Sequence, residues 1–192
     1  MLDKSKELSN WIAVKVDDGE FICDGVNSIS AALLNIAIDH HQSVIVLVER
    51  KLYSSAFALA RSMFESTIRG LWINNCANEQ DVDEMLSKDR LKNFGQLICE
   101  LEAMNCYSSG VLSMTKKSVW ALFNSFTHSG YQQISRQFSG NEIISNFSSD
   151  EVNSLLSHTG ALALLATIEI ASIMNNEPLM LACLDKVKEF SQ

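Results

Sequence analysis

The sequence predicts an all-α protein, and three observations support that prediction. The 192 residues include one proline and eight glycines, far fewer than the many turns of an all-β protein require. Apolar residues recur with helical spacing over long segments. Hydrophobic residues make up 47% and charged residues 20%, a composition typical of globular proteins. We therefore expect one domain over residues 1–192, an up-and-down helical bundle with shorter peripheral helices.

The first three helices follow from apolar faces that repeat every three or four residues. The opening helix ends at the Asp17-Asp18-Gly19 break, and its apolar face comprises Leu8, Trp11, Ile12 and Val16. A second helix is predicted over about 26–50, with a stripe formed by Ile29, Leu33, Ile36, His40, Val44 and Leu47. A third is predicted over about 53–75, with a core face formed by Phe57, Ala60, Phe64, Ile68 and Leu71.

The second half of the chain predicts shorter helices around one long apolar helix. The shorter helices are expected over about 84–87, 91–104 and 111–126. Residues 130–150 are rich in Ser, Asn and Gln and should be partly irregular. A long helix starts near Ser149 and runs to about Met174, and a last helix follows Pro178. The apolar run of the long helix is shorter than the ~20 residues of a membrane span and contains Glu169, which favours a buried core helix.

Charge and cysteine usage narrow the function classes. A net charge of −8 and the lack of basic runs predict no extended nucleic-acid surface. The five cysteines include no CxxC pair, and the N-terminal segment is charged rather than apolar. We therefore expect a cytoplasmic protein with no membrane anchor. HExxH spacing is absent, so no metal site is predicted. Because GxGxxG, P-loop and GxSxG motifs are also absent, we predict no cofactor.

A charged row on the third helix is the first candidate site. Arg61, Glu65 and Arg69 recur every four residues, so each carboxylate–guanidinium pair can meet. One interpretation is a solvated ion-pair ladder of little energetic value. The other is a functional site, because the row borders aromatic side chains, among them Phe64 and Trp72. Both interpretations stay open.

A second polar cluster lies where a helix should end. Trp120, Asn124 and His128 are four residues apart, and Arg136 follows them. His128 either caps backbone carbonyls at the helix C-terminus or acts as a general acid or base. The catalytic candidates are His128, Arg61 and Glu65, and the ligand-binding candidates are Arg69, Trp72, Asn124 and Arg136. We also expect Glu169, if buried, to pair with Arg61 or Arg136.

Two segments, Ala60–Trp72 and Asn124–Arg136, resemble a family of bacterial all-helical proteins of unknown function. The likeness covers the chain from about His40 to Ile173. That family is distantly similar to HEPN-type helical domains, many of which are dimeric RNA-cleaving toxins or phage-defence effectors. HEPN ribonucleases carry an arginine followed four to six residues later by a histidine. No arginine here has that spacing, so the catalytic pair is not transferred; those considered are Arg50, Arg61, Arg69, Arg90 and Arg136.

Two hypotheses follow. The first is a non-catalytic helical module that binds a partner or small ligand and forms a homo-oligomer. The second is an HEPN-like ribonuclease or nucleotide-acting effector of a phage-defence or toxin system. In the second, Arg61, Glu65, His128 and Arg136 converge on RNA or a nucleotide in a local pocket, with His128 as acid or base and the arginines opposite phosphate charge. We favour the first.

Overall fold

The computed structural model describes residues 1–17, 25–88 and 92–191. Nine α-helices, one short 3₁₀ helix at Asn105–Tyr107 and one small hairpin account for the elements found there, which confirms the all-α prediction. Three long helices form the centre of the bundle: α2 (Gly25–Glu49), α3 (Tyr53–Asn75) and α8 (Ser149–Ile173). That residues 1–192 form a single domain stays a prediction.

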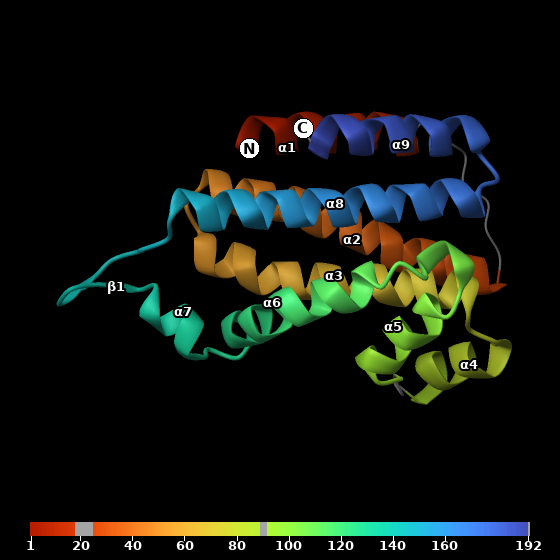
Figure 1. Ribbon diagram of the computed structural model, residues 1–192, viewed down its shortest axis with the longest axis horizontal. Coiled ribbons are helices and arrows are strands. Elements are labelled where there is room, and N and C mark those ends of the chain that lie inside the picture. Colours follow the sequence, from red (N-terminus) through yellow and green to blue (C-terminus); the bar gives the residue numbers. More distant parts are fainter. Residues whose placement is uncertain (18–24, 89–91, 192) are drawn as a thin grey trace.

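Shorter helices cover the two sides of this centre (Figure 1). On one side, α1 (Leu2–Asp17) and α9 (Glu177–Ser191) pack on α8. On the other, α5 (Phe94–Glu102) and α6 (Val111–Thr127) pack on α3, and α4 (Glu79–Lys88) lies beside α5. The site residues of α3 therefore face α5 and α6, not the α1–α9 layer.

The predicted core face of α3 is confirmed. Phe57, Ala60, Phe64, Ile68 and Leu71 are all buried. The predicted stripe of α2 is wrong in part, because Ile36 is 41% exposed and the fully buried histidine is His41, not His40. Since α2 packs against both α3 and α8, its buried face is wider than one stripe and is shifted around the helix.

The start of α4 lies before the predicted residue 84, and a local hydrogen-bond pattern explains why. The Asn78 side chain accepts a hydrogen bond from the backbone N–H of Asp81 (3.0 Å). The Asp81 carboxylate in turn accepts from the backbone N–H of Asn78 (3.2 Å). This reciprocal pattern satisfies two free N–H groups at a helix start, as in a capping box. The helix therefore begins at Glu79.

The long helix α8 begins at a capping box. Ser148 is the N-cap, its side chain accepts from the backbone N–H of Glu151, and the Glu151 carboxylate accepts from the backbone N–H of Ser148. The expectation that Glu169 pairs with Arg61 or Arg136 is wrong. Its carboxylate is buried and accepts hydrogen bonds from three neutral donors, the side chains of Asn74, Asn75 and Tyr107. Amide and hydroxyl donors thus satisfy this buried carboxylate without a cation.

By length and composition alone, α2 and α8 could each cross a membrane. In their most apolar windows, 44% and 61% of the residues are buried inside the fold. Central helices of a packed bundle need the same apolar composition, so these two properties do not separate a core helix from a membrane span.

The predicted irregular region contains little regular structure. It consists of α7 (Tyr131–Ser135) and a hairpin of β1 (Phe138–Ser139) and β2 (Glu142–Ile143). The strands are antiparallel, with Phe138 opposite Ile143. Gly140 has a φ of 62° in the turn, a conformation that glycine adopts without steric cost.

Candidate functional site

The structure brings the three predicted catalytic residues together between α3 and α6. Arg61 donates to the Glu65 carboxylate (3.0 Å) and is 2.7 Å from Nε2 of His128. The Arg61 guanidinium also lies over the Trp120 ring, 5.1 Å from its centroid. We call Arg61, Glu65, Trp120 and His128 the Arg61 cluster. Its two halves come from segments 67 residues apart in the sequence.

The geometry of the Arg61 cluster fixes the role of His128. A guanidinium only donates hydrogen bonds, so Nε2 of His128 must accept, and the ring proton is then on Nδ1. The Nε2 lone pair is consequently occupied and cannot take a proton from a substrate while Arg61 stays in place. The imidazole bonds Arg61, and the capping bond at this helix end is made by the backbone N–H of His128 to Asn124.

Aromatic side chains hold the Arg61 cluster in place. Phe94 of α5 stacks on Trp120 with ring centroids 4.6 Å apart. Lys116 also lies 5.7 Å from the Trp120 ring centroid. Asn124 sits one turn from both Trp120 and His128 on α6, and its side-chain oxygen is buried with no hydrogen-bond partner among the described residues.

Arg136 does not join this cluster. Its guanidinium bonds the Glu151 carboxylate (2.7 Å from Nε) and both the backbone and side-chain oxygens of Gln132. Partial burial raises the pKa of Glu151, but its hydrogen bonds from Ser148 and Arg136 outweigh this and lower it overall. Arg136 therefore ties α7 to the start of α8, with no contact to Arg61, Glu65 or His128 among its bonds.

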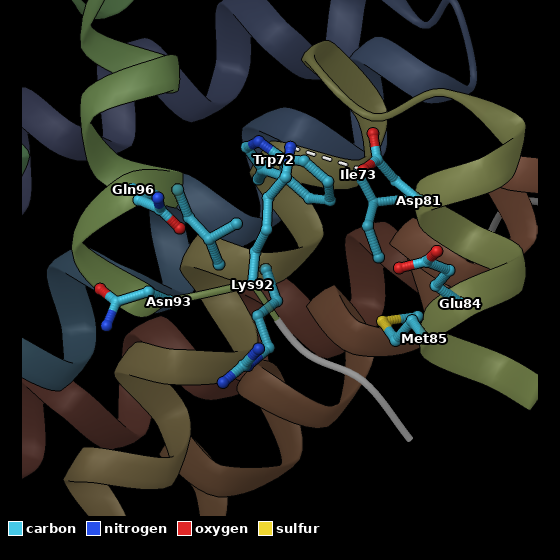
Figure 2. A pocket seen from close by; sticks show the side chains of 10 residues that line it. Trp72, Ile73, Asp81, Glu84, Met85, Lys92, Asn93 and Gln96 are labelled. Carbon is cyan, nitrogen blue, oxygen red and sulfur yellow. Dashed lines mark ion pairs between the residues drawn. The ribbon is translucent and has the colours of Figure 1, made fainter. Parts of the chain in front are cut away.

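The other two ligand-binding candidates, Arg69 and Trp72, line a cavity between α3, α4 and α5 (Figure 2). Its volume is about 250 Å³. We call it the α3–α4–α5 cavity. It is lined by Arg69, Trp72, Ile73, Asp81, Glu84, Met85, Lys92, Asn93, Gln96 and Leu97.

A network around Lys92 forms one wall of this cavity. The Lys92 ammonium lies over the Trp72 ring (4.5 Å) and pairs with Asp81 (3.4 Å) and Glu100 (3.2 Å). The Trp72 N–H donates to the same Glu100 carboxylate (2.6 Å). Desolvation opposes the charge of Lys92, but the hydrogen bond to Glu100 and the charge of Asp81 outweigh it and raise its pKa. This wall is preorganised because its charges are already compensated.

Arg69 differs from Lys92, the other cation that lines the cavity. It makes no ion pair or side-chain hydrogen bond to any residue that the structure describes, whereas Lys92 makes several. Ile73, Met85 and Leu97 supply apolar walls, and the amides of Asn93 and Gln96 add donors and acceptors. The cavity can therefore hold a small molecule that brings a negative charge to Arg69.

The sequence arguments missed most of the lining residues. Lys92 and Asn93 immediately precede α5, and Gln96 lies in its first turn; Asn93 is the N-cap and accepts from the backbone N–H of Gly95. An Asn followed by an apolar helical run is a recognisable helix start. This signal predicts where α5 begins, but it does not predict that α5 packs against Trp72. Within residues 1–17, 25–88 and 92–191, no group of three His, Cys, Asp or Glu is placed to hold a metal ion.

The fold and this cavity define a small helical-bundle protein with a polar pocket at one end of its central helices. The chain belongs to DUF6988, a family of unknown function, and the family match covers residues 34–192. No curated protein and no solved structure matches the chain. The distant HEPN resemblance therefore stays a prediction.

Proposed function

We propose that this DUF6988 protein is a non-catalytic binding module of the cytoplasm, that it works as a homo-oligomer, and that its ligand site is the α3–α4–α5 cavity. The observation behind the proposal is that Arg69 lines a cavity beside Trp72 and makes no ion pair with a described residue, while the two carboxylates of the lining, Asp81 and Glu84, pair with Lys92 and Lys88. A partly buried guanidinium gains most from an anion that it bonds directly. The Arg61 cluster offers no comparable group, because Glu65 and His128 already engage Arg61.

The ligand class follows from the lining. A carboxylate or phosphate group would bond Arg69, and a flat or apolar part would contact Ile73, Met85 and Leu97. The volume of about 250 Å³ is below the usual range for drug-sized ligands, which limits the ligand to a small metabolite.

Thermal unfolding with matched probes tests this proposal. Benzoate and phenyl phosphate join a ring to an anionic group, whereas benzamide has the ring without the charge. We expect at least one of the anions to raise the midpoint for the wild type and for Arg50→Ala, which removes an exposed arginine. Neither anion should stabilise Arg69→Ala. An equal effect of benzamide, or an unchanged effect in Arg69→Ala, would contradict the proposal.

The second candidate is an HEPN-like ribonuclease or nucleotide-acting effector of a phage-defence or toxin system. It is favoured by one observation, the 2.7 Å separation between Arg61 and His128. In this function Arg61 would turn from His128 to a phosphate, and the freed Nε2 would act as acid or base. Cleavage of a labelled RNA by the wild type and by Arg50→Ala, lost in His128→Ala and in Arg61→Ala, would support it. No cleavage by the wild type, or equal cleavage by all four proteins, would reject it.

A further inference from the structure

A projecting segment between α6 and α8 has no role in either site. We call residues 129–148 the arm; it contains α7 and the β1–β2 hairpin. In Figure 1 the hairpin extends beyond the ends of the helices that flank it. It lies at the opposite end of the molecule from α4 and α5, which form the cavity. Its function is therefore separable from ligand binding.

The arm exposes an unusual amount of apolar side chain. Tyr131 is 77% exposed and Ile143 is 81% exposed. Three further apolar residues of the arm are also exposed: Ile134, Phe138 and Ile144. Phe138 and Ile143 lie opposite each other in the two strands, so their exposed side chains share one face of the hairpin. Each partner of a standard interface contributes about 800 Å², so a contact through this face of the hairpin would also cover neighbouring surface of the arm.

The base of the arm is fixed, so this exposure is built into the fold. Gln137 donates to the Ser54 hydroxyl (2.8 Å), and the Asn146 backbone N–H donates to the Arg136 carbonyl (2.8 Å). Phe147 packs against the rings of Tyr53 and Phe57, each with centroids 5.4 Å apart. The exposed side chains are thus held in a defined orientation, which reduces the ordering cost of binding.

The distribution of charge favours a second copy of the chain as the partner of the arm. The whole chain carries −8, so two copies repel each other over most of their surface. The arm contains only two charged residues, Arg136 and Glu142, which cancel. Because Arg136 pairs with Glu151 at the base of the arm, Glu142 is the one charge on its projecting part. The arm therefore carries few charges, and two copies can meet through it with less like-charge repulsion than the net charge of the whole chain would impose.

We propose that the occupant of this face is a second copy of the chain, with the arms of the two copies packed against each other about a twofold axis. A twofold interface uses the same patch on both partners and must be self-complementary. A neutral patch of aromatic and β-branched side chains meets that condition. The proposal specifies the interface of the homo-oligomer. It is independent of the ligand, because the arm shares no residue with the α3–α4–α5 cavity.

Light scattering coupled to size exclusion at micromolar concentration tests the interface. We expect a dimer for the wild type and a dissociation constant at least tenfold higher for Ile143→Glu, which brings two carboxylates together across the axis. Val46→Glu is the matched control, since Val46 is 55% exposed but lies on α2. It should remain dimeric. Circular dichroism of each variant establishes that the helices are intact.

A second variant keeps the test decisive if Ile143→Glu fails to fold. Tyr131→Ser removes the largest exposed ring of the arm without adding charge and should also weaken the dimer. A monomeric wild type would overturn the proposal, and so would a dimer unaffected by either arm variant. Flotation with lipid vesicles by a monomeric wild type, lost in Ile143→Glu, would instead identify the arm as a membrane contact and equally overturn it.

Discussion

Arg61 and Arg69 lie two turns apart on one face of α3, yet their surroundings differ. Arg61 bonds Glu65 and His128 and stacks on Trp120. Arg69 faces a cavity and bonds none of the described residues. Both residues are arginines on the same face of the same helix, so the difference arises from what packs opposite them. The longer α6 reaches Arg61 with a histidine and a tryptophan, whereas the short α4 and α5 leave space beside Arg69.

The contrast between Arg61 and Arg69 shows that arginines of one helix face can have either a structural or a ligand-binding role. The two terminal nitrogens of the Arg61 guanidinium are bonded to Glu65 and His128, which fixes one helix against another and leaves only its buried Nε without a partner among the described residues. A guanidinium without a protein partner keeps its donors for a ligand. The predictions below test whether the Arg61 cluster is structural and the cavity functional.

The largest expected effect comes from Phe94→Ala, because Phe94 supports both regions. Its ring stacks on Trp120 and meets Phe64 edge-on at 5.3 Å, and α5 lines the cavity. Removing a buried ring should lower the free energy of unfolding by about 3 kcal/mol. Urea denaturation measures the change. Met114→Ala, at an exposed position of α6, should change it by less than about 0.5 kcal/mol. Similar small effects in both variants would show that α5 does not link the two regions.

Acid should destabilise the bundle through its buried histidines. Burial lowers the pKa of His41 to about 4, against about 6.5 in an unfolded chain. Below pH 6.5, His41 is protonated in the unfolded state but stays neutral in the folded state. The free energy of unfolding therefore falls as the pH is lowered to about 4. The loss is on the order of 2–3 kcal/mol. His158, whose pKa burial also lowers to about 4, acts in the same direction.

The variant His41→Leu tests that assignment. It should flatten the decline in unfolding free energy between pH 6.5 and 4, because the buried site no longer titrates. Urea midpoints at several pH values give the slope. A decline as steep as in the wild type would remove His41 as its cause.

Arg61→Ala and Arg69→Ala should differ in stability. Loss of Arg61 leaves the half-buried Glu65 carboxylate and the exposed His128 without their partner, which should cost about 1–2 kcal/mol. Loss of Arg69 breaks no bond to a described residue and should change stability by less than about 0.5 kcal/mol. Thermal or urea unfolding of the unliganded variants compares them. Equal losses of unfolding free energy in the two variants would contradict the view that Arg61 is structural and Arg69 is not.

A smaller effect than the loss of Arg61 is expected for the coupling between Arg61 and His128. A double-mutant cycle with Arg61→Ala and His128→Ala should give about 0.5–1 kcal/mol of interaction energy, since His128 is exposed to solvent. A value near zero would mean that the 2.7 Å bond contributes nothing to stability. The function of His128 would then need another explanation.

Local patterns in the sequence predicted the bundle well. Helix α3 matched its predicted bounds because its apolar face repeats regularly and a break lies on each side. The face of α2 was shifted because apolar residues surround most of that helix, so several stripes fit equally well. Only the packing against α3 and α8 selects the buried one.

The candidate site was only partly predictable, for a different reason. The Arg61–Glu65 pair follows from i,i+4 spacing, but its approach to His128 depends on how α6 packs on α3. The pairing of Arg136 with Glu151 could not be predicted from spacing, because Glu151 also belongs to the capping box of α8. The cavity depends on the packing of short helices, which no periodicity in the sequence encodes.

Native mass spectrometry of the protein purified from a bacterial cytoplasm tests the central claim most directly. The wild type, Arg50→Ala, Arg61→Ala and Arg69→Ala are compared under identical conditions. The account predicts a bound small molecule on the first three and its loss from Arg69→Ala. A bound molecule that survives in Arg69→Ala but is lost in Arg61→Ala would contradict the account and make the Arg61 cluster the site.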